Sequence, residues 1–373
     1  MKTRCIVLLG IGHTNAEILN HWAESPIPNC RLVCISKFPT ATYSGMLPGT
    51  LANQFSREEM QIELAPLVER AGAELILDEV IGLDAETRTI NFANRIPLAF
   101  DALSIGIGSV PADWDRFDSP NLIPIKPMQT FIERLDQRIE QCQNNAKEPP
   151  KIVVVGGGVA GVEIAFCVRA RLASWVPARP PSVQIVTSGE EIAGGMSQRS
   201  IRKLRRELSN QSINVITRFP VTEVRENSVS DRSGRLQHAD IVLWATGAVA
   251  PPLLGKLNLP TDERGFLATE ATLRTIAGGP IFAVGDAGTV AANPSPKAGV
   301  FAVRQAPVLW HNLRATIQGS PLSEFDPQKD FLKILNTGQG RALLQYKGFS
   351  FHAHWCWKLK SYIDKGFVGK YRV

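Results

Sequence analysis

Short hydrophobic runs that end in glycine recur along the chain, and they predict buried parallel strands. One runs from Cys5 to Leu9 and another from Ile152 to Val155, and each leads directly into a glycine-rich turn and then a predicted helix. Further runs of this kind end in small residues within 100–109, 240–247 and 281–288. Strands that alternate with helices in this manner predict an α/β fold built on parallel sheets.

The turn after Val155 has the spacing of a dinucleotide-binding loop. Gly156, Gly158 and Gly161 stand in a Gly-x-Gly-x-x-Gly pattern between a predicted strand and a predicted helix. In such a loop the first glycine permits a tight turn, the second lets the backbone approach a pyrophosphate, and the third permits close packing of helix on strand. The helix N-terminus adds unpaired N–H groups that favour phosphate. We therefore predict a dinucleotide site at this turn.

The turn after Leu9 repeats the pattern with one change. Gly10 and Gly12 are in place, but Asn15 stands where the third glycine would be. The next strand ends at Ser36, and the corresponding strand of the second unit ends at Thr187. Because a dinucleotide fold usually places an acid at these positions for the ribose hydroxyls, we expect both ribose contacts to be weaker than usual.

The identity of the nicotinamide nucleotide stays open. The helix predicted after Thr187 carries a basic face made of Arg199, Arg202, Arg205 and Arg206. This face either meets a 2′-phosphate or is simply solvated. The pattern therefore does not choose between NADH and NADPH.

Two other segments are predicted to shape the first site. Residues 43–49, YSGMLPG, contain glycines and a proline in a loop after a nucleotide-binding strand, which favours a shaped backbone near the ligand over a plain turn. Gly285 and Asp286 end the last apolar strand, where a carboxylate suits a sugar or ribitol hydroxyl. A helix predicted over 297–317 begins with Lys297, Ala298 and Gly299, so that N–H groups and a cation would stabilise an anionic reduced flavin ring.

Composition and charge exclude several classes of protein. The 373 residues suggest about two to three domains, and the net charge of +6 comes without a dense basic block, which argues against nucleic-acid binding. No apolar run reaches the ~18 residues of a membrane-spanning helix, and the opening MKTRCIVLLG leads into a glycine turn, so we expect a strand there rather than a signal peptide. The six cysteines form no Cys-x-x-Cys pair, so we expect reduced cytosolic thiols and no metal site.

The tail has a character of its own. Two short strands joined through Gly338 and Gly340 are predicted first, followed by a basic amphipathic helix within 355–373. Its apolar residues recur at helical spacing (Trp355, Leu359, Tyr362, Ile363 and Phe367), and five cations stand against Asp364 alone (Lys358, Lys360, Lys365, Lys370 and Arg372). Such a helix either lies on a membrane surface or packs on the body or on a second subunit, and both readings stay open.

The two glycine loops, the strand that ends in Ala245-Thr246-Gly247 and the strand that ends in Gly285-Asp286 together resemble a family of flavoproteins with two dinucleotide sites. This is the pyridine nucleotide–disulfide oxidoreductase superfamily, which includes the type II NADH dehydrogenases. Four stretches (GIGHTN, YSGMLPG, DALSIGIGS and WCWKLKSYIDKGF) resemble more narrowly the flavoprotein module found fused in front of selenide, water dikinase. That module usually has a second histidine in its first loop where this chain has Asn15.

The resemblance implies two Rossmann-like units, the second inserted in the first. We expect an FAD-binding domain over 1–110 and 246–320, an NAD(P)-binding domain over 111–245, and a C-terminal strand pair and helix over 321–373. The implied FAD ligands are Gly10, Gly12, His13, Asn15, Ser36, Lys37, Val80, Gly108, Gly285, Asp286, Ala298 and Gly299. Those for NADH or NADPH are Gly156, Gly158, Val159, Gly161, Glu163 and Gly247, and Tyr43, Ser44 and Lys297 are expected at the reaction centre.

These residues predict an FAD-dependent oxidoreductase that passes hydride from NADH or NADPH to the flavin and then on to a quinone-like or other small acceptor, with a link to selenium metabolism by family association only. The disulfide-reducing members carry Cys-x4-Cys after the second strand, and its absence here excludes that reaction. Two alternatives stay open: a nucleotide-binding redox sensor without turnover, and a sulfide:quinone reductase-like enzyme using Cys142, Cys167 or Cys356. We expect a cytoplasmic protein, and both peripheral contact to the inner membrane face through 355–373 and a homodimer are left open.

Overall fold

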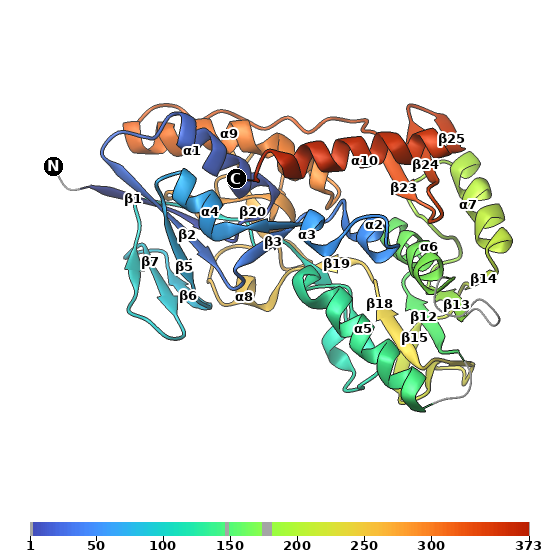
Figure 1. The fold of residues 1–373 in the computed structure, drawn as a ribbon. Helices are drawn as coiled ribbons and strands as arrows, with labels where there is room; N and C mark the ends of the chain where they lie inside the picture. Colours follow the sequence, from blue (N-terminus) through green and yellow to red (C-terminus); the bar gives the residue numbers. More distant parts are fainter. Residues whose placement is uncertain (1–2, 146–148, 174–180, 373) are drawn as a thin grey trace.

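The core of the molecule consists of two five-stranded parallel sheets, one in each half (Figure 1). The computed structural model describes residues 3–145, 149–173 and 181–372. In the first sheet the strand order is β21-β9-β1-β2-β5. The bounds are β1 Arg4–Leu9, β2 Cys30–Ser36, β5 Glu74–Leu77, β9 Ala102–Ile105 and β21 Ile281–Ala283. These strands are apolar on both faces because helices cover one side and small antiparallel sheets the other.

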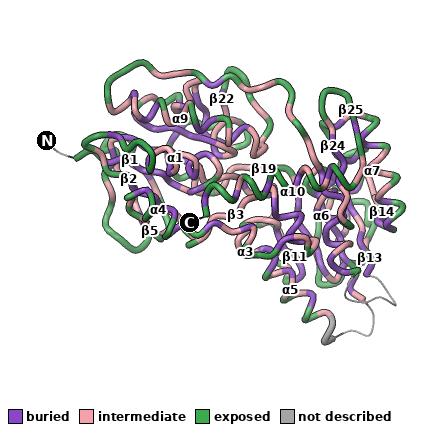
Figure 2. Tube along the Cα trace, turned by 45° about the horizontal axis from the view of Figure 1, so that its top comes forward, coloured by how far each residue is buried: buried purple, intermediate pink, exposed green. Residues whose placement is uncertain are grey.

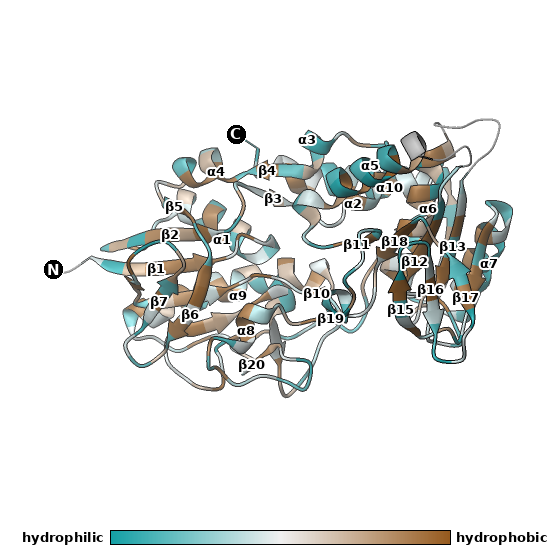
Figure 3. Ribbon diagram, turned by 90° about the horizontal axis from the view of Figure 1, so that it is seen from below, coloured by the Kyte–Doolittle hydropathy of each residue, from teal (hydrophilic) through white to brown (hydrophobic). Residues whose placement is uncertain are grey.

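The second sheet repeats this design in the order β11-β18-β12-β13-β14, with every neighbouring pair parallel. Its strands are β11 Leu122–Pro124, β12 Lys151–Val155, β13 Ser182–Val186, β14 Ile213–Ile216 and β18 Ile241–Trp244. The strands of both sheets are hydrophobic in Figure 3 and buried in Figure 2. The predicted α/β fold with two nucleotide-binding units is therefore confirmed.

The chain passes between the two sheets twice, and the two crossings lie side by side. β10, Val110–Pro111, pairs antiparallel with β19, Ala248–Val249, in this connection. The longer helices pack around the sheets: α1 His13–Glu24, α4 Leu64–Arg70 and α9 Gly299–Gln318 on the first, and α5 Met128–Asn145, α6 Val159–Ala173 and α7 Gln198–Asn210 on the second. Short helices are α2 Leu47–Leu51, α3 Arg57–Met60 and α8 Pro252–Gly255.

Four small sheets of two or three strands complete the two units. They are β3 Thr40–Thr42 with β4 Gln61–Glu63; β6 Val80–Asp84 with β7 Thr89–Phe92 and β8 Leu98–Ala99; β15 Val221–Arg225 with β16 Ser228–Asp231 and β17 Leu236–His238; and β20 Leu267–Thr269 with β22 Gly288–Val290. Each lies beside a parallel sheet and extends its core.

The C-terminal segment contains three strands, not the two that the sequence predicted. β23 Lys333–Asn336 and β24 Ala342–Tyr346 are the expected pair, and β25 Phe349–Ala353 adds a third strand to the sheet. Lys347 and Gly348 form the two-residue turn between β24 and β25, and both have positive φ, as the preferred hairpin turn requires. Sequence analysis misses this strand because only a two-residue turn separates it from β24 and it leads directly into α10.

α10, His354–Gly369, runs from this small sheet across to the first unit (Figure 1). At its far end the Tyr371 hydroxyl donates to Glu17 at 2.5 Å, and Arg372 donates to the carbonyl of Glu58 at 2.8 Å. The C-terminal segment thus contacts both units.

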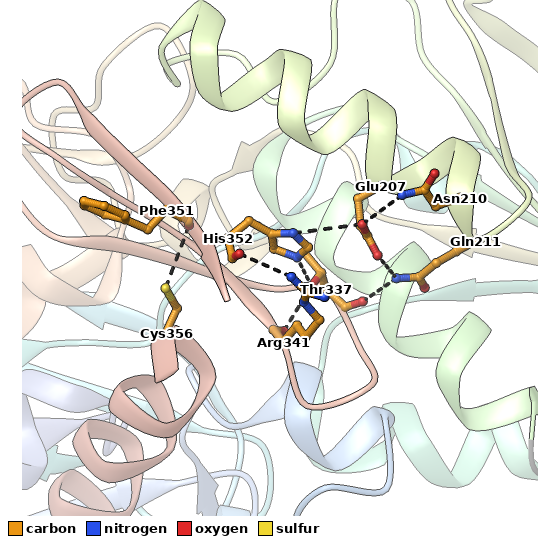
Figure 4. A network of polar contacts seen from close by, with 8 residues as sticks. All are labelled: Glu207, Asn210, Gln211, Thr337, Arg341, Phe351, His352 and Cys356. Carbon is orange, nitrogen blue, oxygen red and sulfur yellow. Dashed lines mark hydrogen bonds and ion pairs between the residues drawn. The ribbon is translucent and has the colours of Figure 1, made fainter. Parts of the chain in front are cut away.

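A polar network attaches the small sheet to α7 of the second unit (Figure 4). The amide of Gln211 donates both to Glu207 and to the carbonyl of Thr337, each at 2.9 Å. His352 on β25 lies 2.9 Å from the Thr337 hydroxyl and 3.9 Å from the Glu207 carboxylate. Burial lowers the pKa of His352, although the Glu207 carboxylate acts in the opposite direction.

Candidate functional site

The first glycine loop joins β1 to α1 and lies against the end of β9. Gly10 has a φ of +80°, and a Cβ there would lie 2.9 Å from the carbonyl oxygen of Gly106. Gly12 is the N-cap of α1, and no side chain caps the first turn of that helix. The first N–H groups of α1 therefore remain available to an anion, which fits the phosphates of a dinucleotide.

Asn15 supports this loop from beneath. Its side chain donates to the carbonyl of Gly10 at 2.7 Å and accepts from the Ser104 hydroxyl at 2.7 Å, and it is fully buried. Asn15 therefore positions the loop against β9, and its side chain does not point toward a ligand as the prediction had it. The Asn15 amide, which stands where the third glycine would be, joins the loop to β9 through these two hydrogen bonds.

Asp286 lies at the end of β21, in a cluster that the sequence only partly indicated. The Ser109 hydroxyl donates to Asp286 at 2.7 Å, and Lys126 Nζ donates to the same hydroxyl at 2.6 Å and lies 3.6 Å from the Asp286 carboxylate. Lys126 follows β11 and thus comes from the second unit. Sequence analysis missed it because no motif marks it; only the fold places the end of β11 beside the end of β21.

Lys297 points away from the first turn of α9. Its Nζ donates to the carbonyl of Gly288 at 2.6 Å and to the Thr289 hydroxyl at 2.9 Å, and it lies 3.9 Å above the ring of Phe266. Burial lowers the pKa of Lys297 to about 8, although Asp286 and Asp262 act in the opposite direction. Lys297 therefore donates to β22 and does not point to the N-terminus of α9 as predicted. The cation that pairs with Asp286 is Lys126.

Ala298 and Gly299 do begin α9 as expected, and His13 faces them. A Cβ on Gly299 would lie 3.5 Å from His13 Nε2, and the Ser44 hydroxyl lies 3.4 Å from the same atom. Burial lowers the pKa of His13 to about 4, while Asp286 acts in the opposite direction. The imidazole is therefore neutral at pH 7 and offers one donor and one acceptor.

The remaining predicted FAD ligands lie around this loop with mixed roles. Ser36 is engaged in its own turn, donating to the carbonyl of Phe38 at 2.7 Å, and Lys37 pairs with Glu79 on the surface. Val80 is buried in the core of the first unit. Gly108 has a φ of +77° and no atom within 4 Å of where a Cβ would be, so space is open beside it.

The second glycine loop joins β12 to α6. A Cβ at Gly161 would lie 2.0 Å from the carbonyl oxygen of Gly156, so helix and strand pack as closely as the pattern predicts. At Gly158 nothing lies within 4 Å of the Cβ position, and this open space is what a pyrophosphate needs. Val159 begins α6, and the carbonyl of Gly247 accepts from Ala112 N at 2.7 Å in the crossing between the units. This loop also fits a dinucleotide.

Glu163 lies on the second turn of α6. Sequence analysis predicts that it contacts the nicotinamide nucleotide, but its side chain faces the C-terminal segment. Its carboxylate accepts from the backbone N–H of Asn336 at 2.8 Å. Burial raises the pKa of Glu163 to about 7, and the charge of Lys360 and the Asn336 hydrogen bond oppose the shift without cancelling it. The side chain turns this way because the loop after β23 covers α6, which only the tertiary structure reveals.

Lys360 and Asp364 form a buried ion pair on the inner face of α10. Lys360 Nζ lies 3.0 Å from Asp364 and donates to the carbonyl of Gly45 at 2.9 Å. Lys360 is 8% exposed, and although burial disfavours its charge, Glu163 and Asp364 together raise its pKa. The sequence signal was the (i, i+4) spacing of a lysine and an aspartate. Of the five cations that the sequence places in the tail, Lys360 is the buried one.

Tyr43 connects this ion pair to the first glycine loop. Its hydroxyl is hydrogen-bonded to Asp364, and burial and that carboxylate raise the pKa of Tyr43. Its ring stacks on Phe367 at 4.4 Å and lies 5.1 Å from the ring of His13. A group of polar side chains therefore extends from α6 through α10 to α1, in which Glu163 and Lys360 interact through their charges and Tyr43 and His13 through their rings: Glu163, Lys360, Asp364, Tyr43, His13 and Ser44. We call it the inter-unit cluster.

The aromatic residues of α10 are divided between its two faces: Trp357 and Phe367 pack against the body, and Trp355 and Tyr362 lie on the outer face. Trp355, Tyr362 and Ile363 are exposed, with Tyr362 at 79%, whereas Cys356, Lys360, Asp364 and Val368 are buried against the body. The helix therefore packs through a face that includes its ion pair and leaves aromatic side chains uncovered. Phe349 and Phe351 on β25 continue this aromatic surface, and Phe351 lies 5.7 Å from the ring of Trp355.

Comparison with known proteins shows which family the chain belongs to. The model of the family described as pyridine nucleotide-disulphide oxidoreductase matches residues 5–312. The chain belongs to this family. Its members bind FAD and NAD(P)H, in agreement with the two loops described above.

Relatives within the family are dehydrogenases and quinone reductases. The chain is 28% identical over 306 residues to the demethylphylloquinone reductase NdbB of Synechocystis sp., covering 75% of this chain and 72% of that protein. It is 22% identical to the NADH dehydrogenase-like protein YutJ of Bacillus subtilis over 89% of both chains. It is 24% identical to the type II NADH:quinone oxidoreductase of Haemophilus influenzae, over 73% of this chain and 64% of that one. The chain is therefore an oxidoreductase of the type II NADH dehydrogenase-like group.

Solved structures share the whole fold. The sulfide:quinone oxidoreductase of Aquifex aeolicus superposes with a TM-score of 0.79 at 16% identity, covering 99% of this chain and 91% of that one. NDH2 from Plasmodium falciparum in complex with NADH gives a TM-score of 0.76 at 15% identity, over 97% of both chains. At these identities the likeness describes the fold and nothing finer.

Cysteine and metal chemistry have little support in the site. All six cysteines are free thiols, and burial raises the pKa of Cys167 and Cys356. Among the described residues, no group of three or more His, Cys, Asp or Glu side chains is placed to hold a metal ion.

Proposed function

We propose that this protein is an FAD-dependent NAD(P)H:quinone oxidoreductase. The inter-unit cluster is the observation that carries the proposal, because it places buried groups that can hold protons between α6 and the first glycine loop. Quinone-reducing relatives support the choice of acceptor. The reaction is NAD(P)H + H⁺ + quinone → NAD(P)⁺ + quinol.

When bound, NAD(P)H and FAD would supply the electron chemistry, a hydride transfer and the two-electron reduction of the quinone. The protein supplies position and protons. Gly10, Gly12 and the first turn of α1 would hold the FAD phosphates, and Asp286, fixed by Ser109 and Lys126, would accept from ribityl hydroxyls. The second loop, with open space at Gly158, would hold the nicotinamide nucleotide.

Quinone reduction needs two protons at the oxygen atoms, and the inter-unit cluster is suited to deliver them. Glu163, with its pKa of about 7, is close to the value at which a carboxyl group both gives and regains a proton at neutral pH. The ammonium of Lys360 and the hydroxyl of Tyr43 are the neighbouring donors. We assign Glu163 as the proton donor, Lys360 as its charged neighbour, and Tyr43, Asp364 and His13 as the groups that connect it to the flavin side.

A peripheral membrane contact completes the proposal. The aromatic surface of β25 and α10 consists of Phe349, Phe351, Trp355, Tyr362 and Ile363, and the cations Lys347 and Lys358 lie next to it in the sequence. Aromatic and basic side chains together suit the interface of a bilayer, from which a lipid quinone would enter. Within the part of the chain that the structure describes, no helix is both long and apolar enough to cross a membrane.

The alternatives predicted from sequence gain no observation in their favour. The raised pKa values of Cys167 and Cys356 disfavour the thiolates that sulfide oxidation needs. The relatives named above do not concern selenium, so that link is left out of the proposal. A redox sensor without turnover would leave the ionisable inter-unit cluster without a role. The domain limits 1–110 with 246–320, 111–245 and 321–373 are retained as part of the proposal.

The variant Gly158→Val tests the proposal. The space around Gly158 is open, so valine should fold normally and occupy the place of the pyrophosphate. We expect the purified variant to keep the visible spectrum of bound flavin and to lose at least about a hundredfold in the rate of bleaching by NADH or NADPH under anaerobic conditions. Gly255→Val, at another position with open space but on α8, should bleach normally. Unchanged bleaching in Gly158→Val would reject the assignment of the second site.

A further inference from the structure

The end of β13 determines what the second loop can recognise on the adenosine ribose. β12 and β13 are paired in parallel with Val155 opposite Val186, so Gly156 and Thr187 emerge at the same edge. A Cβ on Gly157 would lie 2.6 Å from the Thr187 hydroxyl. Thr187 and Ser188 therefore lie directly beside the phosphate loop, where the ribose of a bound nucleotide belongs.

The carboxylates nearest this edge, Glu190 and Glu191, are both paired with arginines in the structure. Thr187, Ser188 and Gly189 are neutral. Glu191 is turned back: its carboxylate accepts from Arg205 Nε at 2.8 Å and from its neighbour Ile192 N at 3.0 Å. The basic face of α7 is thus partly engaged with this glutamate. The groups that select NADH by repelling a 2′-phosphate are missing from the first positions after the strand.

Arg218 stands next to these neutral residues. It lies in the turn after β14, where its backbone N–H donates to the carbonyl of Gly189 at 3.0 Å, and the next residue, Phe219, donates to the carbonyl of Thr187 at 2.8 Å. Arg235 donates to the Arg218 carbonyl. The backbone of Arg218 is therefore fixed at the edge of the site, while its side chain is 71% exposed.

The side chain of Arg218 forms an ion pair with an acidic residue, and another anion can readily replace that residue. Its guanidinium lies 2.9 Å from Glu190, whose side chain is 77% exposed. An ion pair so open to water contributes little. A phosphate dianion carries more charge and accepts two parallel hydrogen bonds from a guanidinium, so it would displace the carboxylate.

We propose that Arg218, with the Thr187 and Ser188 hydroxyls, binds the 2′-phosphate of NADPH, so that this protein prefers NADPH to NADH. This inference rests on the proposed function, since it names the nucleotide of that same second site. It differs from the open reading of the α7 arginines, because the selecting residue comes from the turn after β14.

Equilibrium binding of 2′,5′-ADP and 5′-AMP to the FAD-loaded protein tests the proposal without any turnover. The two probes differ only in the 2′-phosphate. We expect 2′,5′-ADP to bind at least about tenfold more tightly, and Arg218→Gln to remove that difference while 5′-AMP binding stays the same. Arg225→Gln, which removes a similarly exposed arginine paired with Glu223 on β15, is the matched control and should change neither value.

A second variant keeps the test independent of how Arg218→Gln folds. Ser188→Asp places a carboxylate at the exposed edge and should weaken 2′,5′-ADP binding at least about tenfold without weakening 5′-AMP. Equal affinity of the wild-type protein for both probes, or a 2′-phosphate preference that survives both substitutions, would overturn the proposal. If the probes differ as expected but neither NADH nor NADPH bleaches the flavin, the proposal holds and the reductase function fails. If neither probe binds, both fail.

Discussion

At the scale of single residues, burial sets the chemistry of Glu163. The carboxyl group is buried against the end of β23, and removal from water favours its protonated form, which places its pKa at about 7. The shift is upward, so the proton is held below pH 7 and lost as the pH rises through that value. If Glu163 delivers a proton to the quinone, turnover should fall as the pH rises above about 7.

Replacing Glu163 tests this assignment. We expect Glu163→Gln to slow reoxidation of the reduced flavin by quinone about a hundredfold or more and to flatten its dependence on pH near 7, because the amide cannot supply the proton. Reduction of the flavin by the nicotinamide nucleotide should change little. Stopped-flow absorbance separates the two steps, and Glu140→Gln, an exposed site on α5, is the control. A variant whose reoxidation keeps the wild-type pH profile would show that the proton comes from elsewhere.

At the scale of elements, α10 buries an ion pair among apolar residues and leaves some of its aromatic residues exposed. Its inner face carries Lys360 and Asp364, and its outer face carries Trp355 and Tyr362. Periodicity located the helix and its aromatic stripe, but it could not say which face is covered. The buried ion pair is tolerated because Gly45, Tyr43 and Glu163 surround it with hydrogen bonds and charge.

The aromatic surface gives a prediction at this scale. Changing Phe349, Phe351, Trp355 and Tyr362 together to serine should reduce co-sedimentation with anionic lipid vesicles by about tenfold or more, since the variant loses the apolar area that would enter the interface. Flavin content and reduction by NAD(P)H should be unaffected. The control is Ile96→Ser with Leu77→Ser, two exposed apolar residues of the first unit. Vesicle binding that equals the wild type would reject this surface as the membrane contact.

At the scale of the whole molecule, the two units are held together by side chains from three separate parts of the chain. Asp136 on α5 accepts from Arg57 of the first unit and from Arg171 on α6, the latter at 2.5 Å. Arg171 also donates to Asn53 at 2.6 Å. This contact fixes the distance between the two dinucleotide loops, which hydride transfer requires.

Removing the Asp136 carboxylate should therefore loosen the junction. We expect Asp136→Asn to lower the free energy of unfolding by about 1–3 kcal/mol, because two guanidinium groups lose a charged partner in a partly buried place. Chemical denaturation with two probes, flavin absorbance and far-ultraviolet circular dichroism, measures the loss. Glu79→Gln breaks the exposed Lys37 pair and should cost less than about 0.5 kcal/mol. Equal stability of Asp136→Asn and the wild type would show that this contact does not stabilise the junction.

The sequence by itself determined the two glycine loops, the parallel strands that lead into them and the helix of the tail. These features depend on neighbours in the chain: a strand must be apolar to be buried, and a tight turn before a helix needs glycine at Gly156 and Gly161. Tertiary structure decided the rest. Lys126 meets Asp286, Glu163 turns to Asn336, and Lys360 becomes buried only because segments far apart in the chain pack together. No local pattern records which distant segment will cover a side chain, and burial is what sets the charge and the role of these groups.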